Sequence, residues 1–281
     1  MPELPEVETI ARGLRETLLE RTILRVAVFD VRAVPGHTPE EFVHRAGQRT
    51  VTAIRRRGKL LLLDLRGAGQ DRTAQTEAVL TVHLRMTGRI VHGPDRAPEA
   101  HERIRFSLDD GSVLTFADVR RFGGCRVFTP AELAAWSFWQ ALGPEPLELG
   151  ETAFISRFQG RRARIKALLL DQRVLAGVGN IYADESLFRA GIRPDAIASS
   201  LSVQRLDRLR KALQEVLLQA ISENGSSISD YRTARGDAGA FQNSFQAYGK
   251  AGQPCARCGE VLCGCRVAGR SSTFCHKCQT L

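Results

Sequence analysis

Met1-Pro-Glu-Leu-Pro-Glu-Val-Glu-Thr9 opens the chain and leads directly into a helical pattern. Apolar residues recur at helical spacing from Val7 to Leu18, which predicts a helix over residues 5–20. Pro5 suits the first turn of such a helix, and acidic residues are common there. Taken alone, the stretch is explained by an ordinary helix start.

The same stretch also has a chemical interpretation. A small second residue permits removal of Met1, which would leave Pro2 with a free secondary amine of pKa about 8. Such an amine is a better nucleophile at neutral pH than an ordinary lysine, and Glu3 beside it could carry a proton. By themselves, the opening residues favour the ordinary helix start over this chemical interpretation.

Working outward, the rest of the chain predicts an α+β protein with two domains. Its 281 residues suggest two domains, and residues 22–142 change from a helical to a strand pattern. Asp110-Gly111 is typical of a hairpin turn. The predicted strands are residues 23–29, 60–65, 79–84, 104–108, 113–116 and 125–128. Residues 67–77 are predicted to be a loop.

Helices are predicted after a linker at residues 143–150. They span residues 165–170, 181–190 and 202–223, with Val203 on the apolar side of the last one. Gly191 is expected to close the middle helix. Residues 224–252 are rich in glycine, serine and other polar residues and predict a long loop of the kind that often has a function.

Charge is distributed unevenly along the chain. The net charge is +9, of which residues 151–281 contribute +8 (19 basic minus 11 acidic residues). A polyanionic partner would be attracted mainly to that half, although solubility alone can also explain the charge. No apolar run is long enough to span a membrane, and no signal peptide is recognisable, so a cytoplasmic protein is expected.

Six of the seven cysteines lie in the last 27 residues. Cys255 and Cys258 form one CxxC pair, Cys275 and Cys278 form a second, and 16 residues separate the pairs. This spacing predicts one structural zinc ion, because four thiolates leave no open coordination position. Two disulfides are the alternative. Cys263 and Cys265 are either spare thiols or competitors for the metal.

Several motifs together resemble the formamidopyrimidine-DNA glycosylase/endonuclease VIII family. The opening string is most similar to the formamidopyrimidine branch, and the resemblance covers nearly the full chain. The other motifs are Lys59 before an apolar strand, His83-Leu-Arg-Met-Thr-Gly88, Asp118-Val-Arg-Arg-Phe-Gly123, Leu142-Gly-Pro-Glu-Pro146, Gly177-Val-Gly-Asn-Ile-Tyr-Ala-Asp-Glu185 and the cysteine module.

The resemblance implies a β-rich N-terminal sandwich with an N-terminal helix, a helix–two-turns–helix domain and a zinc finger. The corresponding ranges are a catalytic domain at 1–142, a linker at 143–150, the helical domain at 151–224, a lesion-recognition loop and connection at 225–252, and the zinc finger at 253–281. It implies a bacterial, monomeric base-excision-repair enzyme of the cytoplasm and nucleoid. Its partner would be double-stranded DNA with oxidised bases or abasic sites.

The resemblance also implies roles for individual residues. Pro2 would attack the sugar, Glu3 would move protons, Lys59 would serve β-elimination and hold a phosphate, and Arg270 would clamp a phosphate. The implied DNA contacts are Met86, Arg120 and Phe122, which would fill the space of the extruded base, with His101, Arg161 and Asn180. Glu6 and Glu185 match acidic residues near the damaged site.

Alternatives remain for several of these assignments. Met86 and Phe122 are core residues in the simplest interpretation of one sequence, and Glu6 and Glu185 are helix-end or surface carboxylates. An endonuclease VIII-type enzyme acting on oxidised pyrimidines is the nearest alternative function. A non-catalytic DNA-binding zinc protein is the second, and the presence of Pro2, Glu3 and Lys59 argues against it.

Overall fold

The chain divides into two units in the computed structural model, which describes residues 1–71, 75–228 and 231–281. Unit 1 comprises residues 1–140 together with residues 223–240. Unit 2 comprises residues 141–222 and 241–281. The sequence-predicted domain boundaries stay a prediction, and part of the predicted loop at 67–77 lies outside the described residues.

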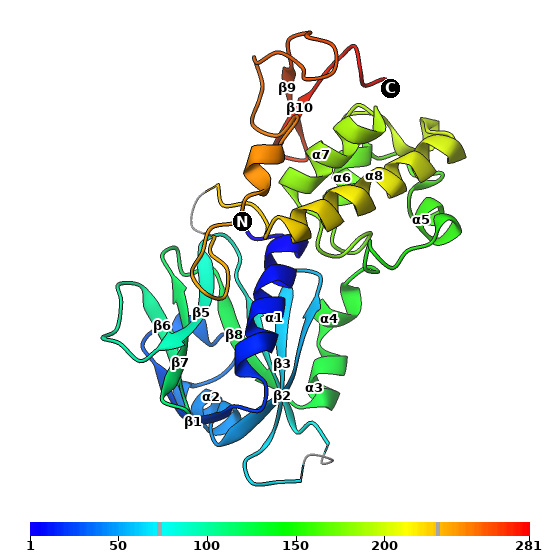
Figure 1. Cartoon of the computed structure of the whole chain (residues 1–281). Coiled ribbons are helices and arrows are strands. Elements are labelled where there is room, and N and C mark those ends of the chain that lie inside the picture. Colours follow the sequence, from blue (N-terminus) through cyan, green and yellow to red (C-terminus); the bar gives the residue numbers. More distant parts are fainter. Residues whose placement is uncertain (72–74, 229–230) are drawn as a thin grey trace. The chain divides into compact units, whose positions relative to one another are not determined.

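Unit 1 is built on helix α1 (Leu4–Leu18) and one antiparallel sheet whose two halves enclose a common core (Figure 1). The strand order is β5-β7-β6-β1-β2-β3-β4-β8. The bounds are β1 Thr22–Val28, β2 Arg49–Arg57, β3 Leu60–Gly67, β4 Ala78–His83, β5 Gly88–Pro94, β6 Glu102–Leu108, β7 Ser112–Asp118 and β8 Gly124–Phe128.

The apolar face of α1 is buried against this sheet. Val7, Ile10 and Leu14 have no exposed surface and share one apolar cluster with residues of β1 to β8. Burying such side chains stabilises a fold by about 1.5–3 kcal/mol each. The described residues of unit 1 also form the helices α2 (Pro39–Ala46), α3 (Pro130–Ala135) and α4 (Ser137–Ala141, whose last residue begins unit 2) and the short 3-10 helix η1 (Val31–Ala33).

Residues 223–240 return from the end of the long helix of unit 2 and pack on unit 1. Tyr231 and Ala234 are buried in the same apolar cluster as α1. The His92 amide donates to the Ala234 carbonyl at 3.0 Å. This part of the predicted long loop is therefore anchored on the sheet and on α1, although the described residues from 223 to 240 contain no helix or strand.

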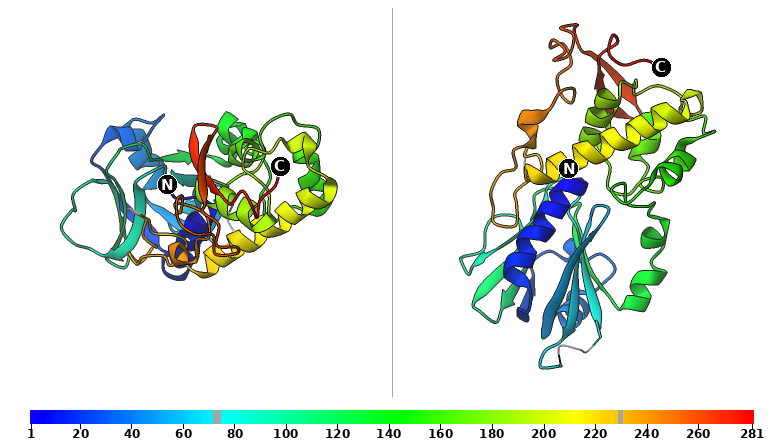
Figure 2. Two further views of the ribbon diagram at one scale, coloured as in Figure 1. Left: turned by 90° about the horizontal axis from the view of Figure 1, so that it is seen from above. Right: turned by 45° about the vertical axis from the view of Figure 1, so that its right-hand side comes forward.

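Unit 2 consists of short helices around one long helix, followed by a hairpin. The elements are α5 (Glu151–Phe158), α6 (Ile165–Leu170), α7 (Asn180–Ala190), α8 (Val203–Ser222), β9 (Cys263–Val267) and β10 (Arg270–Phe274). Gly191 ends α7 with φ 70°, as predicted. Figure 2 shows α8, in yellow, as the long helix that packs against α7. Val203 is 42% exposed, so its predicted place on the buried side is wrong.

Within the described parts of the chain, every helix is too short or too polar to cross a lipid bilayer.

Candidate functional site

The start of α1 holds the predicted nucleophile in a buried position. Met1 is 46% exposed, whereas Pro2 is buried and Glu3 is only 2% exposed. The Glu3 amide donates a hydrogen bond of 2.8 Å to Glu6 Oε2. Since a helix start leaves its first amides without partners in the helix, Glu6 stabilises this end of the chain.

Glu6 also ties the start of α1 to the returning segment. Its Oε1 accepts the Ser226 amide at 2.9 Å. Gly225 has φ 74°, and a Cβ atom there would lie 3.0 Å from Glu6 Cγ and Oε1. Tyr231 donates through its hydroxyl to the Asn224 carbonyl at 3.1 Å. Glu6 is therefore a helix-end carboxylate, as one alternative had it. It is not a surface carboxylate, because the side chain is 1% exposed and joins two segments.

Lys59 and His83 lie at neighbouring strand ends. Lys59 precedes β3 and is 8% exposed, and His83 pairs with Leu60 across the sheet. Burial, with the positive charges of Arg85 and Lys59, lowers the pKa of His83 to about 3. The ring is therefore neutral near pH 7, and its Nδ1 accepts the Arg85 amide at 3.1 Å. A neutral ring adds no further positive charge beside Lys59.

Met86, Arg120 and Phe122 come together on two adjacent turns. Met86 is 40% exposed and Phe122 is 56% exposed, so the core alternative for them is wrong. The Arg120 guanidinium lies 4.7 Å from the centre of the Phe122 ring. Arg120 Nη1 is 3.1 Å from Met86 Sδ. Apolar side chains held in the open beside a cation have the composition of a wedge for stacked bases.

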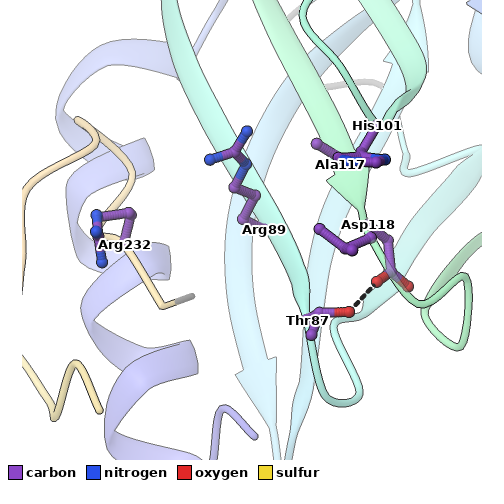
Figure 3. Close-up of a pocket in the computed structure, with 7 residues that line it drawn as sticks. Thr87, Arg89, His101, Ala117, Asp118 and Arg232 are labelled. Carbon is purple, nitrogen blue, oxygen red and sulfur yellow. Dashed lines mark hydrogen bonds between the residues drawn. The ribbon is translucent and has the colours of Figure 1, made fainter. Parts of the chain in front are cut away.

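His101 lines a cavity of about 250 Å³ beside these turns. Figure 3 shows Arg89 on β5 and Arg232 on the returning segment at the same cavity. His101 is exposed and has φ 69°, a strained conformation for a residue other than glycine. Arg89 and Arg232 were not among the sequence-predicted residues, because nothing in the pattern of β5 or of the loop distinguishes them from other arginines.

In unit 2, Asn180 is the first residue of α7 and follows the turn formed by Gly177 and Gly179. The Gly177 amide donates to Gln172 Oε1 at 2.9 Å, which fixes the turn. Asn180 Oδ1 is buried and makes no hydrogen bond within the described residues. A helix N-terminus with an amide side chain suits phosphate oxygens. Arg161, also in unit 2, is exposed.

The four predicted metal ligands form a compact cluster. All four Sγ atoms lie within 4.8 Å of one another. The Cys255–Cys278 and Cys258–Cys275 sulfur distances are 3.9 and 3.5 Å. A tetrahedral zinc with bonds of about 2.3 Å requires about 3.8 Å between thiolates, so the residues fit one such ion. Cys263 Sγ is instead 3.7 Å from His276 Nδ1.

Arg270 begins β10 and is exposed. A buried ion pair between α6 and α7 holds this strand on the two helices. Lys166 of α6 has no exposed surface, and its Nζ donates to Asp184 Oδ1 and to Ser272 Oγ, each at 2.6 Å. It also donates to the Ser271 carbonyl at 2.8 Å. Sequence reasoning missed Lys166, although a lysine at an apolar helix position was a usable signal.

Glu185 is an anchor for the backbone that leads to the cysteine module. Its Oε1 accepts the Ala247 and Tyr248 amides at 2.9 and 2.8 Å, and its Oε2 accepts the Gln246 amide at 3.0 Å. The side chain is 4% exposed. The surface-carboxylate alternative is therefore wrong for Glu185 as well.

Two family models match most of the chain. Residues 1–125 match the formamidopyrimidine-DNA glycosylase N-terminal domain, and residues 142–232 match the H2TH domain of the same enzymes. The chain belongs to the formamidopyrimidine-DNA glycosylase family. This membership makes it a DNA glycosylase of base excision repair, and it confirms the family that the motifs resemble.

Relatives with the name formamidopyrimidine-DNA glycosylase align over nearly their full length. The protein from Moorella thermoacetica is 46% identical, with 93% of each chain covered. The protein from Nitratidesulfovibrio vulgaris is 41% identical, covering 99% of this chain and 100% of its own.

Solved structures confirm the predicted two-domain α+β fold of the formamidopyrimidine-DNA glycosylases. A Lactococcus lactis Fpg variant in complex with DNA containing Fapy-dG superposes with a TM-score of 0.90, at 32% identity and with both chains fully covered. The same protein in complex with DNA containing an abasic site gives a TM-score of 0.88 at 32% identity, covering 99% of this chain and 100% of its own.

Proposed function

We propose that this protein excises oxidised purines, such as 8-oxoguanine and formamidopyrimidines, from double-stranded DNA and then cuts the strand at the resulting site. The supporting observation is the buried pair Pro2 and Glu3 at the start of α1, held to Glu6 and the returning segment in a chain of this family. After removal of Met1, the nitrogen of Pro2 is a secondary amine.

In the first step, the Pro2 nitrogen attacks C1′ of the damaged nucleotide. The C1′–N bond to the base breaks, and the base leaves with its bonding electrons and a proton. Glu3 protonates the sugar ring oxygen as the ring opens. The product is a cationic iminium between Pro2 and C1′, which draws electrons from the rest of the sugar.

The iminium acidifies the proton on C2′. Loss of that proton expels the 3′ phosphate by β-elimination, and a second elimination expels the 5′ phosphate. We assign Lys59 to the first elimination and to a phosphate, because an ammonium can exchange a proton whereas a guanidinium does so poorly. Arg270 is assigned to phosphate clamping. Water then releases the sugar fragment from Pro2.

We assign the DNA contacts in the same way. Met86, Arg120 and Phe122 fill the space of the extruded base, because they are exposed together on two turns. His101, Arg161 and Asn180 contact the backbone phosphates. The protein acts as a monomer. One zinc ion held by Cys255, Cys258, Cys275 and Cys278 fixes the fold of the last segment and takes no part in the chemistry.

The test is single-turnover cleavage of duplexes that contain 8-oxoguanine, an oxidised pyrimidine or an abasic site. The wild-type protein is expected to cut the 8-oxoguanine duplex faster than the pyrimidine duplex. Glu3→Gln should lose excision of 8-oxoguanine but still cut the abasic duplex, since no base has to leave there. Glu40→Gln on α2 is the matched control and should behave as wild type.

Three outcomes would contradict the proposal. Faster cutting of the oxidised pyrimidine would favour the endonuclease VIII-type function. Binding of all three duplexes without any cutting would favour a non-catalytic DNA-binding protein. If Glu3→Gln and Glu40→Gln lost excision of 8-oxoguanine and cutting of the abasic duplex to the same extent, the effect would not be specific to Glu3. Glu3 would then have no assigned role in the chemistry.

A further inference from the structure

The two turns that carry Met86, Arg120 and Phe122 share a single buried carboxylate. Asp118 ends β7, opposite Gly88 at the start of β5, and is 1% exposed. Its Oδ1 accepts the Arg120 amide at 3.1 Å, and its Oδ2 accepts the Gly123 amide at 2.7 Å. Thr87 donates its hydroxyl to Oδ1 as well (Figure 3).

The Thr87 hydroxyl extends this network across both turns. It donates to Asp118 and accepts the Arg120 amide at 3.0 Å. The turn at residues 84–88 and the turn at residues 119–123 are therefore connected through one carboxylate and one hydroxyl. A carboxylate has two oxygens that only accept, and here three donors from two segments converge on them.

Both turns need such support because each contains a strained residue. Arg85 has φ 53° and Arg121 has φ 59°, conformations that side-chain-bearing residues rarely adopt. The turns also touch through backbone: a Cβ atom on Gly123 would lie 2.8 Å from the His83 carbonyl oxygen. The shared carboxylate accepts the backbone amides on either side of Arg121 and the hydroxyl of Thr87, two residues after Arg85.

Asp118 also connects to the segment that carries His101. The Asp118 amide donates to the His101 carbonyl at 3.0 Å, and Arg103 Nε donates to the Asp118 carbonyl at 3.0 Å. Met86, Arg120, Phe122 and His101 thus lie on three segments that meet at one residue.

We propose that Asp118 is a positioning residue for base extrusion. It holds the turns at residues 84–88 and 119–123 in one fixed arrangement before DNA binds. It does not touch the reacting atoms. The inference rests on the proposed function, since it concerns how the wedge residues replace the extruded base. Asn at this position would present an NH₂ group to one of the backbone amides, so one turn would lose its acceptor.

The test follows extrusion through the fluorescence of 2-aminopurine beside 8-oxoguanine in a stopped-flow experiment. Asp118→Asn is expected to slow extrusion about tenfold, the effect of one lost hydrogen bond. Thr87→Val loses the two hydrogen bonds of its hydroxyl and should slow extrusion by at least as much. Thr87→Ser keeps the hydroxyl and should restore the wild-type rate. Asp64 of β3 pairs with Arg55 of β2, so Asp64→Asn makes the same chemical change away from the turns and should have no effect.

A second substrate separates positioning from general damage to the fold. A single-stranded oligonucleotide with a ready-made abasic site has no stacked base to extrude, so Asp118→Asn and Thr87→Val should cut it at the wild-type rate. Equal slowing on both substrates, or wild-type extrusion in Thr87→Val, would overturn the inference. Failure of the wild-type protein to cut the 8-oxoguanine duplex would instead contradict the proposed function.

Discussion

At the scale of single residues, the half-buried His83 makes the stability of unit 1 depend on pH. Its pKa is lowered to about 3 in the folded state, from about 6.5 in an unfolded chain. The folded state therefore resists protonation, and the stabilisation is fully present above pH 6.5 and lost as the pH falls toward 3. The free energy of unfolding should decrease by at most about 1.4 kcal/mol per pH unit in this window.

An asparagine in place of His83 keeps an acceptor for the Arg85 amide but cannot titrate. His83→Asn should therefore reduce the dependence of stability on pH between pH 6.5 and 4, whereas His44→Asn, at an exposed position, should not. Both tryptophans, Trp136 and Trp139, lie in unit 1, so urea unfolding followed by tryptophan fluorescence reports on this unit. The same slope in wild type and His83→Asn would contradict the assignment.

Single residues also show how far the sequence could predict the candidate site. The two CxxC pairs predict a cluster by spacing alone, because short loops bring their own cysteines together. Asp118 and His83 could not be found in this way. Their partners are backbone amides whose direction depends on the positive φ angles of Arg85 and Arg121, which the residue types do not reveal.

At the scale of elements, the Lys166–Asp184 pair holds β10 on α6 and α7. Removing one member of a buried ion pair costs about 3–5 kcal/mol, because the remaining charge stays buried without its partner. Lys166→Met should lower the stability of unit 2 by that order and speed hydrogen exchange of the Thr273 amide, which donates to Asp184. Lys211→Met, at an exposed position on α8, is the control. Equal stability of the two variants would show that the pair is not structural.

The cysteine module offers a second test at this scale. If the four cysteines hold one zinc ion, as proposed, Cys258→Ser should lose it and unfold the β9–β10 hairpin, while the tryptophan-monitored unfolding of unit 1 stays unchanged. Cys263→Ser should keep the metal, because its sulfur lies beside His276 and outside the cluster. One zinc per chain in Cys258→Ser, measured by atomic absorption, would contradict the four-thiolate site and point to Cys263 or Cys265.

Some elements were predicted from their sequence patterns, whereas others, among them the helices α2, α3, α4 and α5, were missed. The helices α1, α6, α7 and α8 and six of the strands were predicted close to their observed bounds. Strand β2 was missed because it carries four arginines among its nine residues, and β5 because it begins with Gly88 and ends with Gly93-Pro94. Their pairing with β3 and β7 decides their structure, and such pairing is not visible in local sequence.

At the scale of the whole molecule, the excess charge of residues 151–281 predicts how binding depends on salt. Neutralising about five phosphates gives a slope near −4.5 in a plot of log K against log salt concentration. Fluorescence anisotropy with undamaged duplex should give nearly the same slope as with lesion DNA, since phosphate contacts do not depend on the base. A slope near zero would rule out binding through phosphates.

The most direct test of the account is to identify the residue that becomes attached to DNA. Borohydride reduction during the reaction converts the iminium into a stable bond, and peptide mapping by mass spectrometry locates that bond. We predict attachment at Pro2, with Met1 absent, in both the wild-type protein and Lys59→Ala acting on an abasic site. A protein that retains Met1 should not be trapped at Pro2, because that nitrogen is then an amide. Attachment at Lys59 in the wild-type protein would contradict the Pro2 mechanism.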